Sequence, residues 1–172
     1  MKNLTLALGA FLTLFIISCE GPQGIPGIDG DKFEARAFEI NTDLAPSSTS
    51  SNILEFSANY PSGFTLLSGD AILIYRLEEV TNGNPVWRQL PQPISTDDGL
   101  LFYNFDFTQG DYSIYVEPGF DISLIQPDIS QDQFFRIIVI PTDLRTSKLD
   151  TSNMDAVLSA LNIDEAAIRV VE

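Results

Sequence analysis

The chain has no histidine, one cysteine and few cations, and each shortage removes a class of function. Without histidine, a serine–histidine–aspartate triad, a histidine-ligated zinc ion and imidazole acid–base catalysis are excluded. A single cysteine forms no disulfide bond within the chain. Nine lysines and arginines stand against 24 aspartates and glutamates, which gives a net charge of −15. Nucleic acid is therefore not expected as a partner, because phosphate binding requires clustered cations.

The first 18 residues differ in composition from the rest of the chain. Lys2 precedes an apolar run from Leu4 to Ile17 that is interrupted only by two threonines and one glycine. This run is too short to cross a membrane as a helix, and its positive start is typical of a secretory signal peptide. A buried amino-terminal helix is the alternative interpretation.

The only cysteine, Cys19, follows the apolar run directly after the small residue Ser18. The stretch Ile16-Ile17-Ser18-Cys19 resembles the lipobox of bacterial lipoproteins, with isoleucine where the family usually has leucine. The resemblance implies cleavage between Ser18 and Cys19, a diacylglyceryl thioether on Cys19 and an acyl chain on its amine. Two or more lipid chains anchor a protein stably on a membrane. A free structural thiol is the alternative.

Four consecutive Gly-X-Y triplets follow the cysteine, with glycines at Gly21, Gly24, Gly27 and Gly30. A collagen triple helix needs glycine at every third position because only hydrogen fits at its axis. Four triplets make a very short triple helix, so we favour an extended spacer that reaches roughly 35–40 Å. A trimerising stalk is the alternative. The chain thus divides into a signal peptide (1–18), a lipidated cysteine with a tether (19–32) and a folded domain (33–172).

Strand patterns dominate the folded domain. Alternating or continuous apolar runs predict strands at 33–40, 53–60, 71–80, 86–90, 100–107, 112–117, 120–125 and 134–141. Asn82-Gly83 predicts a tight hairpin that brings Trp87 beside the Tyr75–Leu77 end of the preceding strand. Residues 91–99 are expected to be a turn-rich connection. Short strands at this spacing predict a mainly β fold, an antiparallel β-sandwich of immunoglobulin-like or jelly-roll-like kind.

The carboxyl-terminal segment changes to a helical period. Met154, Val157, Leu158 and Leu161 fall on one stripe of a helix. Ser152 is the expected N-cap, and Asn162 is expected to end the helix in a left-handed conformation. We expect this α-helix to pack its stripe on an open face or end of the sandwich. One more helical turn and a last short strand are expected after it.

Two groups of side chains are candidates for ligand binding. The aromatic side chains of Trp87, Tyr103, Tyr112 and Tyr115 offer flat surfaces on which sugars or peptides stack, with core packing as the alternative. Loop carboxylates offer hard oxygen ligands for calcium, although no EF-hand spacing is present. These carboxylates are Asp97, Asp98, Asp121, Asp128 and Asp132. Solvated charges that keep edge strands from pairing are the alternative.

Four features of the chain together resemble lipoproteins from the envelopes of Bacteroidota. They are the lipobox-like end, the Gly-X-Y triplets, the "NGNPVWRQLPQ" hairpin and "FFRIIVIP" with a capped helix. The resemblance supplies no catalytic residues. It implies a lipid-anchored envelope protein, and Glu20 after the cysteine favours the outer membrane. We expect a binding or structural module with a protein or glycan ligand, no catalysis and no cofactor besides the calcium considered above. A carbohydrate-binding or glycan-processing surface domain is the alternative.

Replacing Cys19 with alanine tests the anchor. We expect Cys19→Ala to move the protein out of the membrane fraction, because the acylated sulfur is the proposed attachment point. Cell fractionation of wild type and variant measures this, together with mass spectrometry of protein from its native cells. An unchanged membrane fraction for Cys19→Ala, or an intact Met1 and a bare thiol in the wild type, contradicts the prediction.

Overall fold

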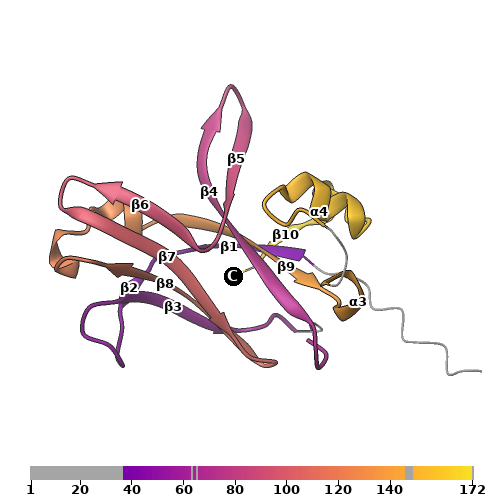
Figure 1. The fold of residues 1–172 in the computed structure, drawn as a ribbon, viewed down its shortest axis with the longest axis horizontal. Coiled ribbons are helices and arrows are strands. Elements are labelled where there is room, and N and C mark those ends of the chain that lie inside the picture. Colours follow the sequence, from indigo (N-terminus) through magenta and orange to yellow (C-terminus); the bar gives the residue numbers. More distant parts are fainter. Residues whose placement is uncertain (1–36, 63, 65, 146–148, 172) are drawn as a thin grey trace, which may run out of the picture. The chain divides into compact units, whose positions relative to one another are not determined.

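Figure 1 shows the computed structural model, which describes residues 37–62, 64, 66–145 and 149–171. The predicted signal peptide, Cys19, the Gly-X-Y triplets and residues 33–36 of the first predicted strand lie outside the described residues. Within these described ranges, no helix is both long and apolar enough to cross a membrane.

Ten strands in the described residues form two five-stranded sheets, and the predicted mainly β sandwich is confirmed. The first sheet has the order β10-β1-β9-β4-β5 and the second the order β2-β3-β8-β7-β6. Neighbouring strands run antiparallel except β1 and β10, which are parallel. The strands of the first sheet are β1 (Ala37–Thr42), β4 (Ala71–Thr81), β5 (Asn84–Gln89), β9 (Gln133–Ile140) and β10 (Arg169–Val171). Those of the second are β2 (Ala45–Pro46), β3 (Leu54–Asn59), β6 (Gln92–Thr96), β7 (Gly99–Phe107) and β8 (Asp111–Pro118).

The main hydrophobic core lies between the two sheets. Successive side chains of a strand point to opposite faces, so alternate residues of each strand enter the core. The second sheet contributes Leu54, Leu101, Tyr103, Tyr112, Ile114 and Val116, and the first contributes Phe38, Ile40, Ile72, Ile74, Phe135, Ile137 and Val139. The predicted apolar faces of β3, β7 and β8 are therefore the faces that the fold buries.

A second apolar cluster covers the other face of the first sheet. The helix α4 (Met154–Ala160) buries Met154, Val157 and Leu158 against Tyr75, Ile138 and Ile140. Figure 1 shows this helix beside the first sheet. As predicted, Asn162 follows the helix with a left-handed φ of 54°, and a short helix η3 (Glu165–Ala167) then leads into β10.

One buried cation joins these elements. Arg136 on β9 is 4% exposed. Its Nε and Nη2 donate to Glu39 Oε1 at 2.8 and 2.6 Å, and its Nη1 donates to Glu165 Oε1 at 2.7 Å. The guanidinium also lies 4.4 Å from the ring centroid of Trp87. These contacts compensate the loss of hydration that burial imposes on the charge.

The hairpin prediction is confirmed. Asn82 and Gly83 both have positive φ, 53° and 82°, as a two-residue turn of type I′ requires. Thr81 pairs with Asn84, and Leu77 pairs with Trp87, so Trp87 lies at the expected end of β4.

The predicted turn-rich connection at residues 91–99 is reduced to a turn at Asp97 and Asp98. Gln92–Thr96 is the strand β6, paired with β7 from Gln92↔Tyr103 to Thr96↔Gly99. Pro93 lies within this strand, although proline is uncommon in strands. An edge strand has one partner only, so it tolerates a residue that lacks an N–H group.

Two further local predictions are wrong. Residues 120–125 form no strand, because Asp121 accepts a hydrogen bond from the Ser123 N–H and begins the short helix η2 (Ile122–Leu124). A second short helix, α2 (Pro127–Ser130), follows. The N-cap of α4 is Asn153, whose side chain accepts from the Ala156 N–H. Ser152 instead donates both its N–H and its hydroxyl to Asp150 Oδ1.

Removing the buried cation is expected to destabilise the domain. Arg136→Ala leaves Glu39 without its partner inside the protein, so we expect the free energy of unfolding to fall by about 3–5 kcal/mol. Urea denaturation measures the change. The matched control is Arg88→Ala, which removes an exposed arginine paired with Glu78 and is expected to leave the urea midpoint unchanged. Equal urea midpoints for Arg136→Ala and wild type would show that the ion pairs of Arg136 do not stabilise the domain.

Candidate functional site

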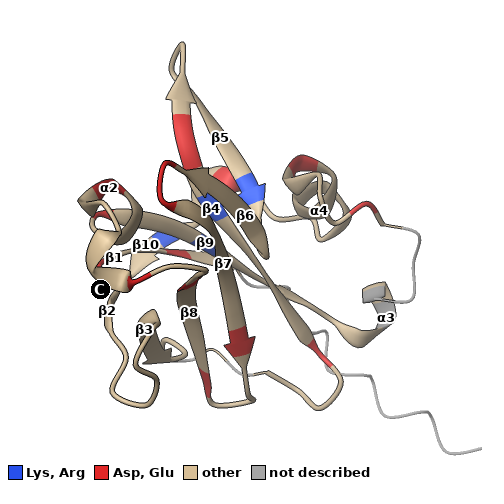
Figure 2. Cartoon of the chain, turned by 60° about the vertical axis from the view of Figure 1, so that its left-hand side comes forward, with Lys and Arg blue, Asp and Glu red and all other residues tan. Residues whose placement is uncertain are grey.

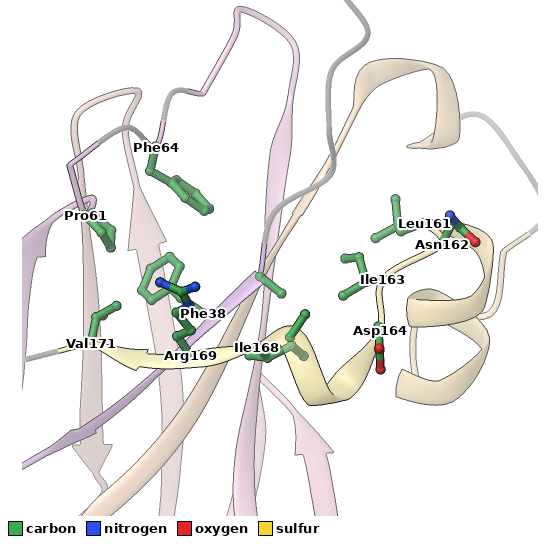
Figure 3. Close-up of a pocket in the computed structure, with 12 residues that line it drawn as sticks. Phe38, Pro61, Phe64, Leu161, Asn162, Ile163, Asp164, Ile168, Arg169 and Val171 are labelled. Carbon is green, nitrogen blue, oxygen red and sulfur yellow. The ribbon is translucent and has the colours of Figure 1, made fainter.

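A groove at the start of β1 is the candidate binding site, and Figure 3 shows it with its lining side chains. The groove has a volume of about 620 Å³. Nine of its twelve lining residues are apolar: Ala37, Phe38, Pro61, Phe64, Leu161, Ile163, Ala167, Ile168 and Val171. The three polar ones are Asn162, Asp164 and Arg169. A volume of this size, lined mostly by apolar groups with a few polar ones, is typical of sites for small molecules.

Aromatic contacts position one wall of the groove. Phe64 meets the Phe38 ring edge-to-face at 5.0 Å between centroids and stacks on Tyr60 at 5.6 Å. The Phe64 N–H donates to the Pro61 carbonyl at 3.0 Å, which closes a turn between these two residues. The backbone turn and the two ring contacts together hold Phe64 beside the core residue Phe38.

The carboxyl-terminal segment forms the opposite wall. Asn162 and Ile163 donate their N–H groups back to carbonyls of α4, and this turn carries Ile163 towards the groove. Asp164 caps η3 by accepting from the Ala166 N–H at 3.0 Å. In Figure 3, Leu161, Ile163 and Ile168 lie across the groove from Pro61 and Phe64.

A second, smaller cavity of about 350 Å³ lies beside β5 and β6. It is lined by Trp87, Arg88, Gln89, Pro91, Gln92, Pro93 and Ser152. Trp87 Nε1 and Gln92 Oε1 are buried and have no hydrogen-bond partner among the described residues, and Gln92 is only 8% exposed. A buried donor and a buried acceptor without partners are costly, so a polar molecule that serves both is favoured at this position.

The four predicted aromatic residues do not form one platform. Tyr103 and Tyr112 lie inside the core between the sheets, so neither offers a face to a ligand. Trp87 lies on the first sheet under the Arg136 guanidinium. Tyr115, of opposite parity to Tyr112, lies half-buried on the outer face of the second sheet.

The predicted calcium ligands are not gathered into a metal site. Asp97 and Asp98 form the turn between β6 and β7 and, with Asp128, line a cavity that also contains Arg76 and Glu78. Asp121 caps η2, and hydrogen bonds from Ser123 hold the pKa of its carboxyl below the usual value. Asp132 donates its N–H to Asp43 on a neighbouring loop. Among the described residues, no three acidic or sulfur-bearing side chains are close enough to hold a metal ion.

The sequence interpretation missed the groove and its cation. Phe38, Phe64 and Ile168 belong to three distant segments, so no local spacing relates them. One signal was present: Arg169 interrupts the apolar end "AAIRVV" of a strongly acidic chain.

No protein-family model, curated protein or solved structure is significantly similar to this chain.

The buried tyrosines predict a loss of stability in alkali. Burial raises the pKa of Tyr103 to about 12 and that of Tyr112 to about 12, and burial also raises the pKa of Tyr60 and Tyr75. In the unfolded chain, the pKa of a tyrosine is about 10. The folded state therefore keeps protons that the unfolded state releases, and the stability this contributes is complete below about pH 10.

We expect the free energy of unfolding to fall as pH rises from about 10 to about 12, by about 1.4 kcal/mol per pH unit for each of the core residues Tyr103 and Tyr112. Urea denaturation across this range measures the slope, and tyrosinate absorbance follows ionisation in the folded protein. The control is the same absorbance titration in denaturant. Tyrosinate appearing at the same pH in folded and denatured protein would contradict the prediction.

Proposed function

We propose that this chain is a lipid-anchored protein of the bacterial cell envelope whose β-sandwich is a non-catalytic binding module. The observation that carries the binding role is the apolar groove of about 620 Å³ between Phe64 and Ile168. The attachment rests on the sequence, where Cys19 follows an apolar run and the small residue Ser18. The Gly-X-Y triplets would act as the spacer between the lipid and the sandwich.

The proposed location is the outer membrane, as the resemblance to envelope lipoproteins of Bacteroidota implies. Glu20 follows the cysteine, so the aspartate that favours retention at the inner membrane in some bacteria is not present at this position. With a net charge of −15, the chain has no attraction for anionic headgroups, and the acyl chains on Cys19 would supply the attachment.

Two properties of the groove favour binding over catalysis. The ionisable side chains among its described lining residues are Asp164 and Arg169, and one carboxylate oxygen of Asp164 already accepts the Ala166 N–H. Among the described residues, the lining contains no serine, threonine or cysteine that a neighbouring base would activate. An apolar ligand held by burial is the chemistry that such a lining serves.

A glycan-binding role is the second candidate, and it rests on the cavity beside Trp87. Trp87 and Gln92 both line this cavity, and each carries a buried polar atom, Nε1 and Oε1, that has no partner among the described residues. A sugar hydroxyl can accept from such a donor and donate to such an acceptor. Binding of wild type but not of Trp87→Phe on a glycan array would favour this role. Absence of wild-type binding to every glycan on the array would contradict it.

Binding of a neutral apolar fluorophore tests the groove. The protein used is the chain from residue 19 onward carrying Cys19→Ser, so that it remains free of lipid. We expect pyrene to bind and Ala167→Trp to weaken binding at least tenfold, because Ala167 is exposed and lines the groove. Pyrene fluorescence, which reports the polarity around the ring, measures both.

The matched control is Ala166→Trp, which adds the same bulk at the exposed neighbouring position outside the groove lining. It is expected to bind like wild type. Absence of pyrene binding, or equal losses in the two variants, contradicts the proposed binding role of the groove.

A further inference from the structure

Arg169, the one cation among the described lining residues of the groove, lies on the core-facing side of an edge strand. Arg169 is the residue paired with Phe38 across the parallel strands β10 and β1, and Val171 is paired with Ile40. Paired residues of neighbouring strands project to the same face, so Arg169 shares the face of Phe38 and Val171. Val170, which projects to the other face, is 56% exposed. An arginine thus stands on the apolar side of β10, where it lines the groove.

Arg169 differs from the other arginines whose side chains the structure describes. Arg136 pairs with Glu39 and Glu165, and Arg88 pairs with Glu78. Arg76 donates to Gln133 Oε1 at 2.9 Å and covers the Tyr103 ring. Arg169 has no carboxylate or hydrogen-bond partner among the described residues. Figure 2 shows how few basic positions stand among the many acidic ones. Of the four arginines with described side chains, Arg169 is the one with neither an ion pair nor a hydrogen bond to a described residue.

We propose that the groove binds an amphiphile with one carboxylate and a single apolar chain, and that Arg169 pairs with the carboxylate. This inference rests on the proposed binding role and names its ligand class. The planar guanidinium presents two parallel N–H groups that match a carboxylate, while Phe38, Phe64 and Ile168 cover the chain of the ligand.

The surroundings of Arg169 favour a monoanion over a phosphate. Asp164 also lines the groove, and Glu165 follows it in the sequence. A dianionic phosphate would be repelled by these carboxylates and by the net charge of −15, whereas a monocarboxylate carries half that charge. A cationic amphiphile would be repelled by the Arg169 guanidinium at the same position.

Competition between matched amphiphiles tests the ligand class. Decanoate, decanol and decylammonium share one chain and differ in the charge of the head group, and each is tested for displacement of pyrene from the lipid-free Cys19→Ser protein. We expect Arg169→Gln to weaken decanoate about tenfold and to change decanol less than twofold, because only the carboxylate pairs with the guanidinium. Added salt is expected to weaken decanoate and not decanol, since it screens an exposed pair.

The matched control is Arg88→Gln, which makes the same change of net charge outside the groove and is expected to leave decanoate binding within twofold of wild type. Equal decanoate affinity for wild type and Arg169→Gln, with pyrene still displaced by decanol, overturns the carboxylate inference and leaves the proposed binding role standing. Equal losses for Arg88→Gln and Arg169→Gln also overturn it.

Discussion

A buried guanidinium connects the first sheet to the segment that forms one wall of the groove. Arg136 projects from the central strand β9 and meets Glu39 of β1, Glu165 of η3 and the ring of Trp87 on β5. A charge held away from water is tolerated only when its partners are in place, so these four elements must be in position together. Glu165 precedes Ile168 and Arg169 by three and four residues. The ion pair that holds η3 therefore also determines where the groove wall and its cation lie.

The groove lies where the sandwich is least covered. The edge strand β10 has only three residues and pairs with β1 in parallel, and the buried core residue Phe38 of β1 is one of the groove's lining residues. Phe64 and Ile163 lie on opposite sides of the groove (Figure 3). Within this strongly acidic chain, Arg169 is the one cation among the described residues that line this apolar surface, and it would attract a ligand of negative charge.

Local patterns predicted the strands well wherever one face is buried and the other exposed. The alternation in β3, β7 and β8 matches the faces that the fold buries, and Asn82-Gly83 turns the chain where its conformational preference requires. The predictions failed where one sequence pattern is compatible with both a strand and a short helix. Phe120, Ile122 and Leu124 alternate as in a strand, yet a capping aspartate and a following proline favour short helices. The groove was beyond local prediction because its walls come from residues distant in the sequence.

The amino-acid sequence by itself determined the strand alternation, the stripe of α4 and the absence of imidazole chemistry, because each of these depends on residue type and short-range spacing. It could not distinguish Arg136 from Arg169. Both are single cations within apolar runs, "FFRIIVI" and "AAIRVV". Only the tertiary structure decided that one is enclosed between two carboxylates and an indole ring while the other lies beside an apolar groove. The physical reason is that the partners of a charge, unlike its position in a strand, come from distant parts of the chain.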